Sequence, residues 1–271
     1  MKIFKFGGAS VKDADSVKNV ASIIKNEGAK DTLVVVSAMG KMTNAFEEVV
    51  DAYYNKKDNL PEKLNYIEDY HKKIMSSLFD KTDAIYEKVD VLFGELGWFL
   101  ARNTSKRYNY VYDQIICFGE LLSTKIVSAY LEKIGTENIW FDARNFIKTD
   151  SNYRDAKVDW ELTQELITEK VDATKINITQ GFIAANDTEN TTTLGREGSD
   201  YTAGIFAYCL NAASVTIWKD VDGVLNADPR VFEKTTLLQQ ISYEEAIEMA
   251  FYGASVIHPK TLQPLERKEI P

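Results

Sequence analysis

The sequence predicts an α/β protein built on a mainly parallel central sheet. Residues 32–37 (TLVVVS) form an unbroken β-branched run, which is typical of a strand buried on both faces. Similar short apolar runs recur at 2–6 and 214–218, and segments with helical periodicity lie between the runs. With 271 residues, 45% of them hydrophobic, the chain is long enough for one large domain or two closely packed lobes.

The first 36 residues predict a strand, a glycine turn, a helix and a second strand. Residues 2–6 (KIFKF) form the first strand, and Gly7 and Gly8 end it. Apolar residues then recur near helical spacing over 11–26.

From about 44 to 134 the pattern becomes helical and rich in acids. Pro61 opens one helix, the polar stretch 103–109 separates another, and a long helix is predicted at 113–133. We interpret about 44–112 as a helical insertion in the α/β fold.

Strand patterns resume at 138–142 and 176–184. The polar, threonine- and glycine-rich stretch that follows, up to 200, is predicted to lack regular structure, and a helix is predicted at 200–210. Because no repeat or flexible linker is visible, we expect the two halves to share one continuous sheet.

After the strand at 214–218, residues 220–230 are rich in turn formers, and a helix is predicted at 243–252. Ser242 and Glu245 can form a capping box at its start, with Gly253 as its stop.

Charge and composition exclude several classes of function. The 41 acidic and 32 basic residues give a net charge of −9, which disfavours binding to nucleic acid through general charge. Cys117 and Cys209 cannot build a disulfide framework, and His71 and His258 are too few for common zinc patterns. We therefore expect a reducing compartment and no protein metal site, so that any metal arrives with a ligand. No apolar run approaches the length of a membrane span, and we expect a cytoplasmic protein.

The first candidate site is Lys5 with Gly7, Gly8 and the residues up to Ser10. Paired glycines at the end of a strand let backbone amides approach an anion, a following helix adds its positive end, and the lysine adds a mobile charge. The pattern is neither a Walker loop nor a dinucleotide fingerprint. On its own, such a pair is more often only a tight turn.

The second candidate is the segment 191–200, where a helix begins. Arg196 offers a planar fork for a carboxylate or phosphate, and Ser199 or Asp200 can cap the helix. The alternative is a capping loop with a solvated arginine. The density of hydroxyl groups, glycines and both charge signs favours a functional role.

The third candidate is the segment 219–230, directly after a strand of buried type. Three aspartates and two basic residues lie where open parallel sheets bind ligands: Lys219, Asp220, Asp222, Asp228 and Arg230. The alternative is an ordinary cluster of turns. The segment lacks the glutamate that a calcium loop needs at its twelfth position.

In this order, these motifs resemble the amino acid kinase family, and most closely the aspartate kinases. The resemblance spans essentially all 271 residues. Six ordered segments carry it: KFGGAS (5–10), VVVSAMGKMTN (34–44), FGE (118–120), TTLGREGSDYTA (192–203), WKDVDGVLNADPR (218–230) and YGASVIHPKTLQP (252–264).

The resemblance implies a three-layer α/β/α sandwich formed by a single catalytic domain over 1–271. An amino-acid-binding lobe would cover about 1–180, and a nucleotide-binding lobe about 181–271. Family members usually continue into small regulatory ACT domains, which we do not expect within residues 1–271. Because it stops at Pro271, where another strand is expected, we expect an excised domain rather than a naturally short form.

The resemblance further implies transfer of the γ-phosphoryl group of Mg-ATP to the β-carboxylate of L-aspartate. A carboxylate with a pKa of about 4 is already ionised at neutral pH and needs no general base. Lys5 would neutralise charge on the transferred group, and Asp200 would orient Lys5 and the substrate amine.

By the same resemblance, Arg196 would grip a substrate carboxylate and Glu120 the α-ammonium, while Ser37, Thr43 and Ser199 supply hydroxyls. The residues implied for ATP binding are Lys5, Gly7, Gly8, Ser10, Lys219, Asp220, Asp228 and Arg230.

Three residues depart from the usual family pattern, and nucleotide affinity is the property they would affect: Glu197, Leu225 and Ser255.

Three other functions are alternatives to an aspartate kinase. The first is a kinase of glutamate, acetylglutamate or a nucleotide, and the second is a ligand-binding homologue without turnover. The third is an oxidoreductase, for which the glycine fingerprint is missing. A homodimer, weaker without regulatory domains, is left open.

Overall fold

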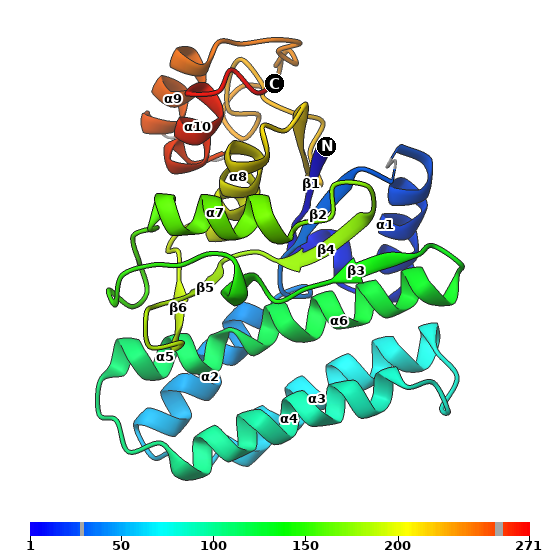
Figure 1. Ribbon diagram of the computed structural model, residues 1–271, viewed down its shortest axis with the longest axis vertical. Helices are drawn as coiled ribbons and strands as arrows, with labels where there is room; N and C mark the ends of the chain where they lie inside the picture. Colours follow the sequence, from blue (N-terminus) through cyan, green and yellow to red (C-terminus); the bar gives the residue numbers. More distant parts are fainter. Residues whose placement is uncertain (28–29, 253–256) are drawn as a thin grey trace.

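A five-stranded parallel sheet forms the centre of the protein (Figure 1). The computed structural model describes residues 1–27, 30–252 and 257–271. The strands lie in the order β3-β4-β2-β1-β7. Their bounds are β1 Lys2–Phe6, β2 Thr32–Val36, β3 Asn138–Trp140, β4 Ile176–Gln180 and β7 Ser214–Trp218. Since β7 pairs with β1 along its whole length, the expectation that both halves share one sheet is confirmed.

Helices cover both faces of the sheet, as the predicted three-layer sandwich requires. On one face, Phe4 and Phe6 of β1 pack in a core with helices α1 (Ala14–Glu27) and α6 (Phe118–Lys133). On the other face, Ile3 packs in a second core with α7 (Trp160–Lys170) and α8 (Gly198–Leu210). Alternate residues of each strand therefore belong to different cores, because successive side chains of a strand point to opposite faces.

Four helices occupy the region interpreted as an insertion: α2 Met42–Tyr54, α3 Leu60–Leu78, α4 Ile85–Arg102 and α5 Tyr108–Ile116. As predicted, Pro61 lies in the first turn of its helix. The single long helix predicted at 113–133 is wrong. The chain breaks at Cys117 into α5, which packs against α2, and α6, which packs along the sheet.

A short antiparallel pair corrects two further predictions. The strand predicted at 176–184 ends at Gln180 and resumes as β5 (Ile183–Ala185), after Phe182 with a φ of 72°. The stretch before 200 is also not irregular throughout, because β6 (Thr191–Thr193) pairs with β5. Side chains of α5 order β6: Gln114 exchanges two hydrogen bonds with the backbone of Thr191 (2.7 and 3.1 Å).

The C-terminal part adds α10 (Pro259–Glu266), which packs against α8, and α9 (Tyr243–Phe251), which packs against α10 (Figure 1). The predicted capping box of Ser242 and Glu245 is confirmed. Gly253 and Ser255 lie outside the described residues. Helices α7 and α10 were not predicted.

Two further observations concern the chain as a whole. Cys117 and Cys209 are free thiols, and both are buried. In the described part of the chain, none of the helices combines the length and apolar character that crossing a bilayer requires.

His71 of α3 makes the unfolding free energy sensitive to acid. Its ring is fully buried, Nδ1 lies 2.8 Å from the Ile67 carbonyl oxygen, and burial lowers its pKa from 6.5 to about 4. Below pH 6.5 the unfolded chain binds a proton that the folded protein excludes until about pH 4. We therefore expect the unfolding free energy to fall by about 3 kcal/mol between pH 7 and 4 on this account.

Urea unfolding at pH 7.5, 6 and 5 tests this expectation with His71→Leu, which should show a weaker pH dependence. His258→Asn serves as the control because it removes the half-buried histidine and keeps a cap for α10. Equal pH dependence in the His71→Leu variant and the wild type would contradict the expectation.

Candidate active site

Four strands end level with one another at one edge of the sheet. In the strand register Phe6 lies beside Val36 and Trp218, and Val36 lies beside Gln180. The chain leaves this edge at Gly7, Ser37, Gly181 and Lys219. Open α/β sheets bind ligands outside the carboxyl ends of their strands, so this edge is the expected place for a site.

A buried cluster of three charged groups lies at this edge. Lys5 lies on the face of β1 that α8 covers, and its ammonium is 2.6 Å from Oδ1 of Asp200 in the first turn of α8. The ammonium of Lys219, which follows β7, is 3.3 Å from Oδ2 of the same carboxylate. The Lys5 and Asp200 side chains are only 8% and 3% exposed. Two cations around one carboxylate leave the cluster with an excess of positive charge.

The start of α8 differs from the prediction that Ser199 or Asp200 caps it. The N-cap residue is Glu197, with a φ of 51° and no side-chain hydrogen bond to the helix. The carboxylate of Asp200 instead faces the two lysines, so it is available to hold Lys5 in place.

The glycine turn after β1 brings two backbone segments into close contact. A Cβ atom on Gly8 would lie 2.7 Å from the carbonyl oxygens of both Ala38 and Gly40, and the Gly40 amide donates a 2.9 Å hydrogen bond to the Gly8 carbonyl. A Cβ on Gly7 would lie 3.6 Å from the Lys5 ammonium. The glycine turn thus lies directly beside the Lys5 ammonium, at ordinary contact distance. Ser10 lies in the short 3-10 helix that follows.

Glu120 reaches the same edge from the opposite layer. Helix α6, which carries Glu120, approaches the residues after β2 closely because Gly119 packs on Ala38. A Cβ atom on Gly119 would lie only 3.1 Å from the Cβ atom of Ala38. Burial raises the pKa of Glu120 to about 8, although a hydrogen bond from the Ala38 amide opposes this rise. Oε2 of Glu120 is buried and has no hydrogen-bond partner among the described residues. One helical turn on, the Ser123 hydroxyl donates a 2.7 Å hydrogen bond to the Ser37 carbonyl and ties α6 to this edge.

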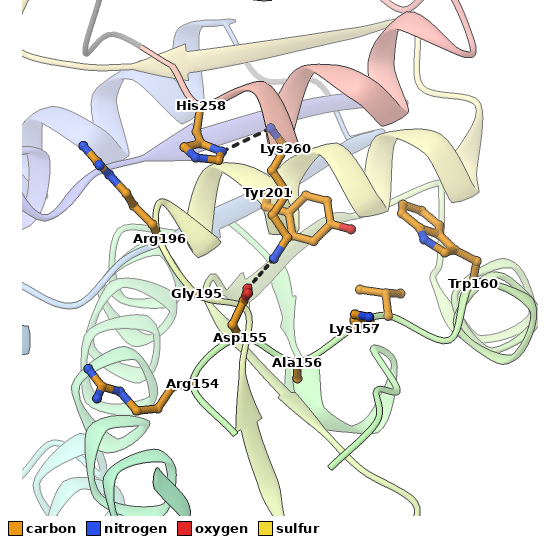
Figure 2. Close-up of a pocket in the computed structure, with 11 residues that line it drawn as sticks. Arg154, Asp155, Ala156, Lys157, Trp160, Gly195, Arg196, Tyr201, His258 and Lys260 are labelled. Carbon is orange, nitrogen blue, oxygen red and sulfur yellow. Dashed lines mark hydrogen bonds and ion pairs between the residues drawn. The ribbon is translucent and has the colours of Figure 1, made fainter. Parts of the chain in front are cut away.

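Arg196 is exposed, directly before α8. It lines a cavity of about 690 Å³ together with residues of the 154–160 segment, Tyr201 and Lys260 (Figure 2). Lys5 and Glu120 do not line this cavity. Arg196 and Asp200 nevertheless lie at the same end of α8, so the arginine is near the lysine cluster in the fold.

Of the remaining predicted residues, two lie in the first turns of helices and three lie in the loop after β7. Thr43 is half-buried in the first turn of α2, and Ser199 is half-buried in the first turn of α8. Asp228 and Arg230 pair with each other in the loop after β7, at 2.7 Å between Nη2 and Oδ2, and this pairing lowers the pKa of Asp228 to about 2. Asp220 is exposed at the start of that loop.

Sequence patterns did not single out Gly181 and Phe182, which follow β4. A Cβ on Gly181 would lie 2.4 to 2.6 Å from the Cβ, Oγ and Cα atoms of Ser199, so glycine lets the start of α8 rest on the end of β4. The Phe182 amide donates a 2.9 Å hydrogen bond to the Thr202 hydroxyl. The glycine after β4 could have indicated this contact in the sequence. The strand predicted at 176–184 instead extends past it.

Within the ranges 1–27, 30–252 and 257–271, no group of three or more His, Cys, Asp or Glu side chains is placed to hold a metal ion.

Comparison with known proteins gives a consistent result over the whole chain. Residues 1–271 match the model of the amino acid kinase family. The chain is 34% identical to lysine-sensitive aspartokinase 3 of Escherichia coli over 99% of its length, and 34% identical to bifunctional aspartokinase/homoserine dehydrogenase 2, chloroplastic, of Arabidopsis thaliana. It spans 60% of the first relative and 30% of the second. The crystal structure of E. coli aspartokinase III in complex with aspartate and ADP superposes with a TM-score of 0.89 at 33% identity, over 100% of this chain and 60% of that one.

Proposed function

The chain belongs to the amino acid kinase family, and on that premise we propose that it is an aspartate kinase. It would transfer the γ-phosphoryl group of Mg-ATP to the β-carboxylate of L-aspartate and release ADP and β-aspartyl phosphate. The observation that carries the proposal is the buried Lys5–Asp200 ion pair beside the glycine turn. The relative whose structure contains aspartate and ADP supports the choice of substrates.

The chemical step needs positioning and charge neutralisation more than proton transfer. The attacking carboxylate oxygen is already ionised, and the new P–O bond forms as the bond from the γ-phosphorus to the bridging oxygen breaks, with the electron pair leaving on ADP. Lys5 would face the negative oxygens of the transferred group, and amides of the Gly7–Gly8 turn would add dipoles there. Asp200 would keep the Lys5 ammonium directed at this point.

The amino acid would be held by groups from both helix layers. Arg196 would bind the α-carboxylate through its planar fork, and Glu120 would pair with the α-ammonium. Ser37, Thr43 and Ser199 would add hydroxyl groups around the substrate. The unpartnered Oε2 of Glu120 supports this assignment, because a buried acceptor without a partner is costly until a donor arrives.

The nucleotide would lie over the ends of β1 and β7. We assign its phosphates to Lys5, Gly7, Gly8, Ser10 and Lys219. The nucleoside would lie farther along the 220–230 loop, with Asp220, Asp228 and Arg230. Mg²⁺ would arrive with ATP. This assignment divides the chain into an amino-acid lobe of about 1–180 and a nucleotide lobe of about 181–271.

The compartment and the assembly state are also proposals. The buried free thiols of Cys117 and Cys209 support a reducing compartment such as the cytoplasm. A homodimer is the assembly to test by light scattering.

Coupled ADP release with Mg-ATP tests the function against a panel of L-aspartate, L-glutamate, acetylglutamate and uridylate. L-Aspartate should give the highest kcat/KM. A preference for another acceptor would reassign the substrate within the family, and nucleotide binding without ADP release from any acceptor would indicate a ligand-binding homologue.

The raised pKa of Glu120 predicts that aspartate binding depends on pH. Free Glu120 is mainly protonated below pH 8, whereas pairing with the substrate ammonium requires the carboxylate. Binding therefore releases a proton, and the KM for aspartate should fall roughly ten-fold between pH 6.5 and 8 and then level off.

Steady-state kinetics at several pH values tests this dependence, together with calorimetry in two buffers of different ionisation enthalpy to count the released proton. Glu120→Gln is the control: it should raise the KM at every pH and remove the dependence. The same pH slope in that variant would show that another group titrates.

A further inference from the structure

The loop that carries Arg196 is attached to two other parts of the chain. Lys260, at the start of α10, donates a 2.9 Å hydrogen bond to the carbonyl oxygen of Leu194 and a 2.8 Å hydrogen bond to Oδ1 of Asp155 (Figure 2). Its ammonium also lies 5.0 Å from the ring centroid of Tyr201 in α8. One side chain thus links residues 155, 194 and 201.

Gly195 completes the attachment. Its φ is 79°, and a Cβ at this position would lie 2.6 Å from Oδ1 of Asp155. The carboxylate that Lys260 binds therefore rests directly on the peptide that precedes Arg196. One residue on, the amide of Ala156 donates a 2.9 Å hydrogen bond to the carbonyl of Thr193. The backbone up to residue 195 is held between the 154–156 segment and α10.

The conformation around Arg196 needs such support. Gly195 and Glu197 both have positive φ values, 79° and 51°. A left-handed conformation is unfavourable for a glutamate and persists only where the surrounding structure holds it. The Lys260 hydrogen bonds act on the residue before this turn, and Tyr201 lies in the helix after it.

We propose that Lys260 and Asp155 are positioning residues that hold the Arg196 loop in place for the amino-acid substrate. We call this pair the Lys260 brace. The inference rests on the proposed function, in which Arg196 binds the α-carboxylate of aspartate. The proposed function assigns neither residue to a substrate, so the brace would act on the reaction through the position of the arginine.

The expected change in the KM for aspartate on loss of Lys260 follows from how exposed Lys260 and Asp155 are. The Asp155 side chain is 72% exposed and that of Lys260 is 30% exposed, so their mutual attraction is strongly screened. The hydrogen bond to a backbone carbonyl and the contact with Tyr201 add to it. We expect loss of Lys260 to raise the KM for aspartate about five-fold. The kcat should change less than about two-fold, because the α-carboxylate is remote from the transferred group and binds similarly in the ground and transition states.

Lys260→Met is the primary variant, and the chain offers a matched control in Lys268→Met. Lys268 follows α10, lies 4.9 Å from the ring of Tyr208 in α8 and donates a 2.9 Å hydrogen bond to Asn211, but makes no contact with the 194–197 loop in these interactions. Lys260→Arg should restore a low KM, because a guanidinium can donate to both the carboxylate and the carbonyl. Asp155→Asn should raise the KM less than Lys260→Met, and it provides a second variant if the first is unstable.

Hydrogen exchange without substrates separates this inference from the proposed function. Peptides covering residues 194–199 should exchange faster in Lys260→Met than in the wild type and in Lys268→Met. If the wild type shows no aspartate-dependent ADP release but this exchange difference holds, the brace stands and the substrate assignment fails. Wild-type exchange and wild-type KM in Lys260→Met would overturn the brace.

Discussion

Replacing Lys5 with methionine is expected to lower kcat by a factor on the order of a hundred to a thousand. The side chain is 8% exposed and its ammonium lies 2.6 Å from Asp200, so nothing from solvent can take its place at the transferred group. Lys219 still neutralises Asp200 in the variant, which should therefore remain folded. Coupled ADP release at saturating aspartate and ATP measures the effect, with circular dichroism as the check on folding.

Lys2→Met is the matched control, since Lys2 lies on the same strand and is exposed at its other end. It should keep wild-type kcat. If Lys5→Met proves unstable, Lys5→Arg retains the charge while moving it, and should still lose most of the activity. Near-normal kcat in a folded Lys5→Met protein would remove Lys5 from the chemistry.

Gly181→Ala is expected to have the second largest effect, on both stability and turnover. The added Cβ would lie 2.4 to 2.6 Å from atoms of Ser199, one of them the backbone Cα, so the first turn of α8 must move. Asp200 lies in that turn, and its displacement separates it from Lys5 and Lys219. We expect a loss of about 2 kcal/mol in unfolding free energy and at least roughly a ten-fold fall in kcat.

The control for this substitution is Gly97→Ala in α4, where a Cβ would meet nothing within 4 Å. Because alanine is favoured over glycine inside a helix, this variant should gain about 0.5–1 kcal/mol and keep its activity. Urea unfolding and coupled assays on both variants test the contrast. Equal stability of Gly181→Ala and the wild type would mean that α8 tolerates the shift.

The central sheet was predictable because its strands carry their own local signal. The strands at 2–6 and 214–218 have the bounds predicted from their apolar runs, and the run at 32–37 is one residue longer than β2. The capping box of α9 is likewise a local pattern, formed by two residues three positions apart.

The elements that were missed depend on contacts between distant residues. Strand β6 is a run of three threonines, and nothing in that run shows that Asp113 accepts hydrogen bonds from both the amide and the hydroxyl of Thr193 (2.9 and 2.8 Å). Burial raises the pKa of Asp113 to about 6, and these bonds oppose that rise. The two helices that meet at Cys117 also pack against different partners, α5 against α2 and α6 against the sheet.

In the candidate site, too, the sequence identifies single residues but not the contacts between distant ones. The resemblance indicated that Asp200 orients Lys5, but not that Lys219 shares the same carboxylate. Sequence spacing likewise cannot reveal that Gly181 packs on Ser199, because β4 and α8 meet only in the folded protein. The positions of these residues relative to one another require coordinates.

The pairing of β1 with β7 sets the order in which a newly made chain can become active. Lys5 leaves the ribosome well before residues 214–218, and β2 can cover one side of its strand early. The other side stays without a neighbour until residues 214–218 emerge, and Asp200 and Lys219 belong to the same late portion. Until residues 214–218 emerge, β1 is thus an open strand edge of the kind that invites mispairing. We therefore expect chaperones to bind the nascent chain until β7 has paired with β1.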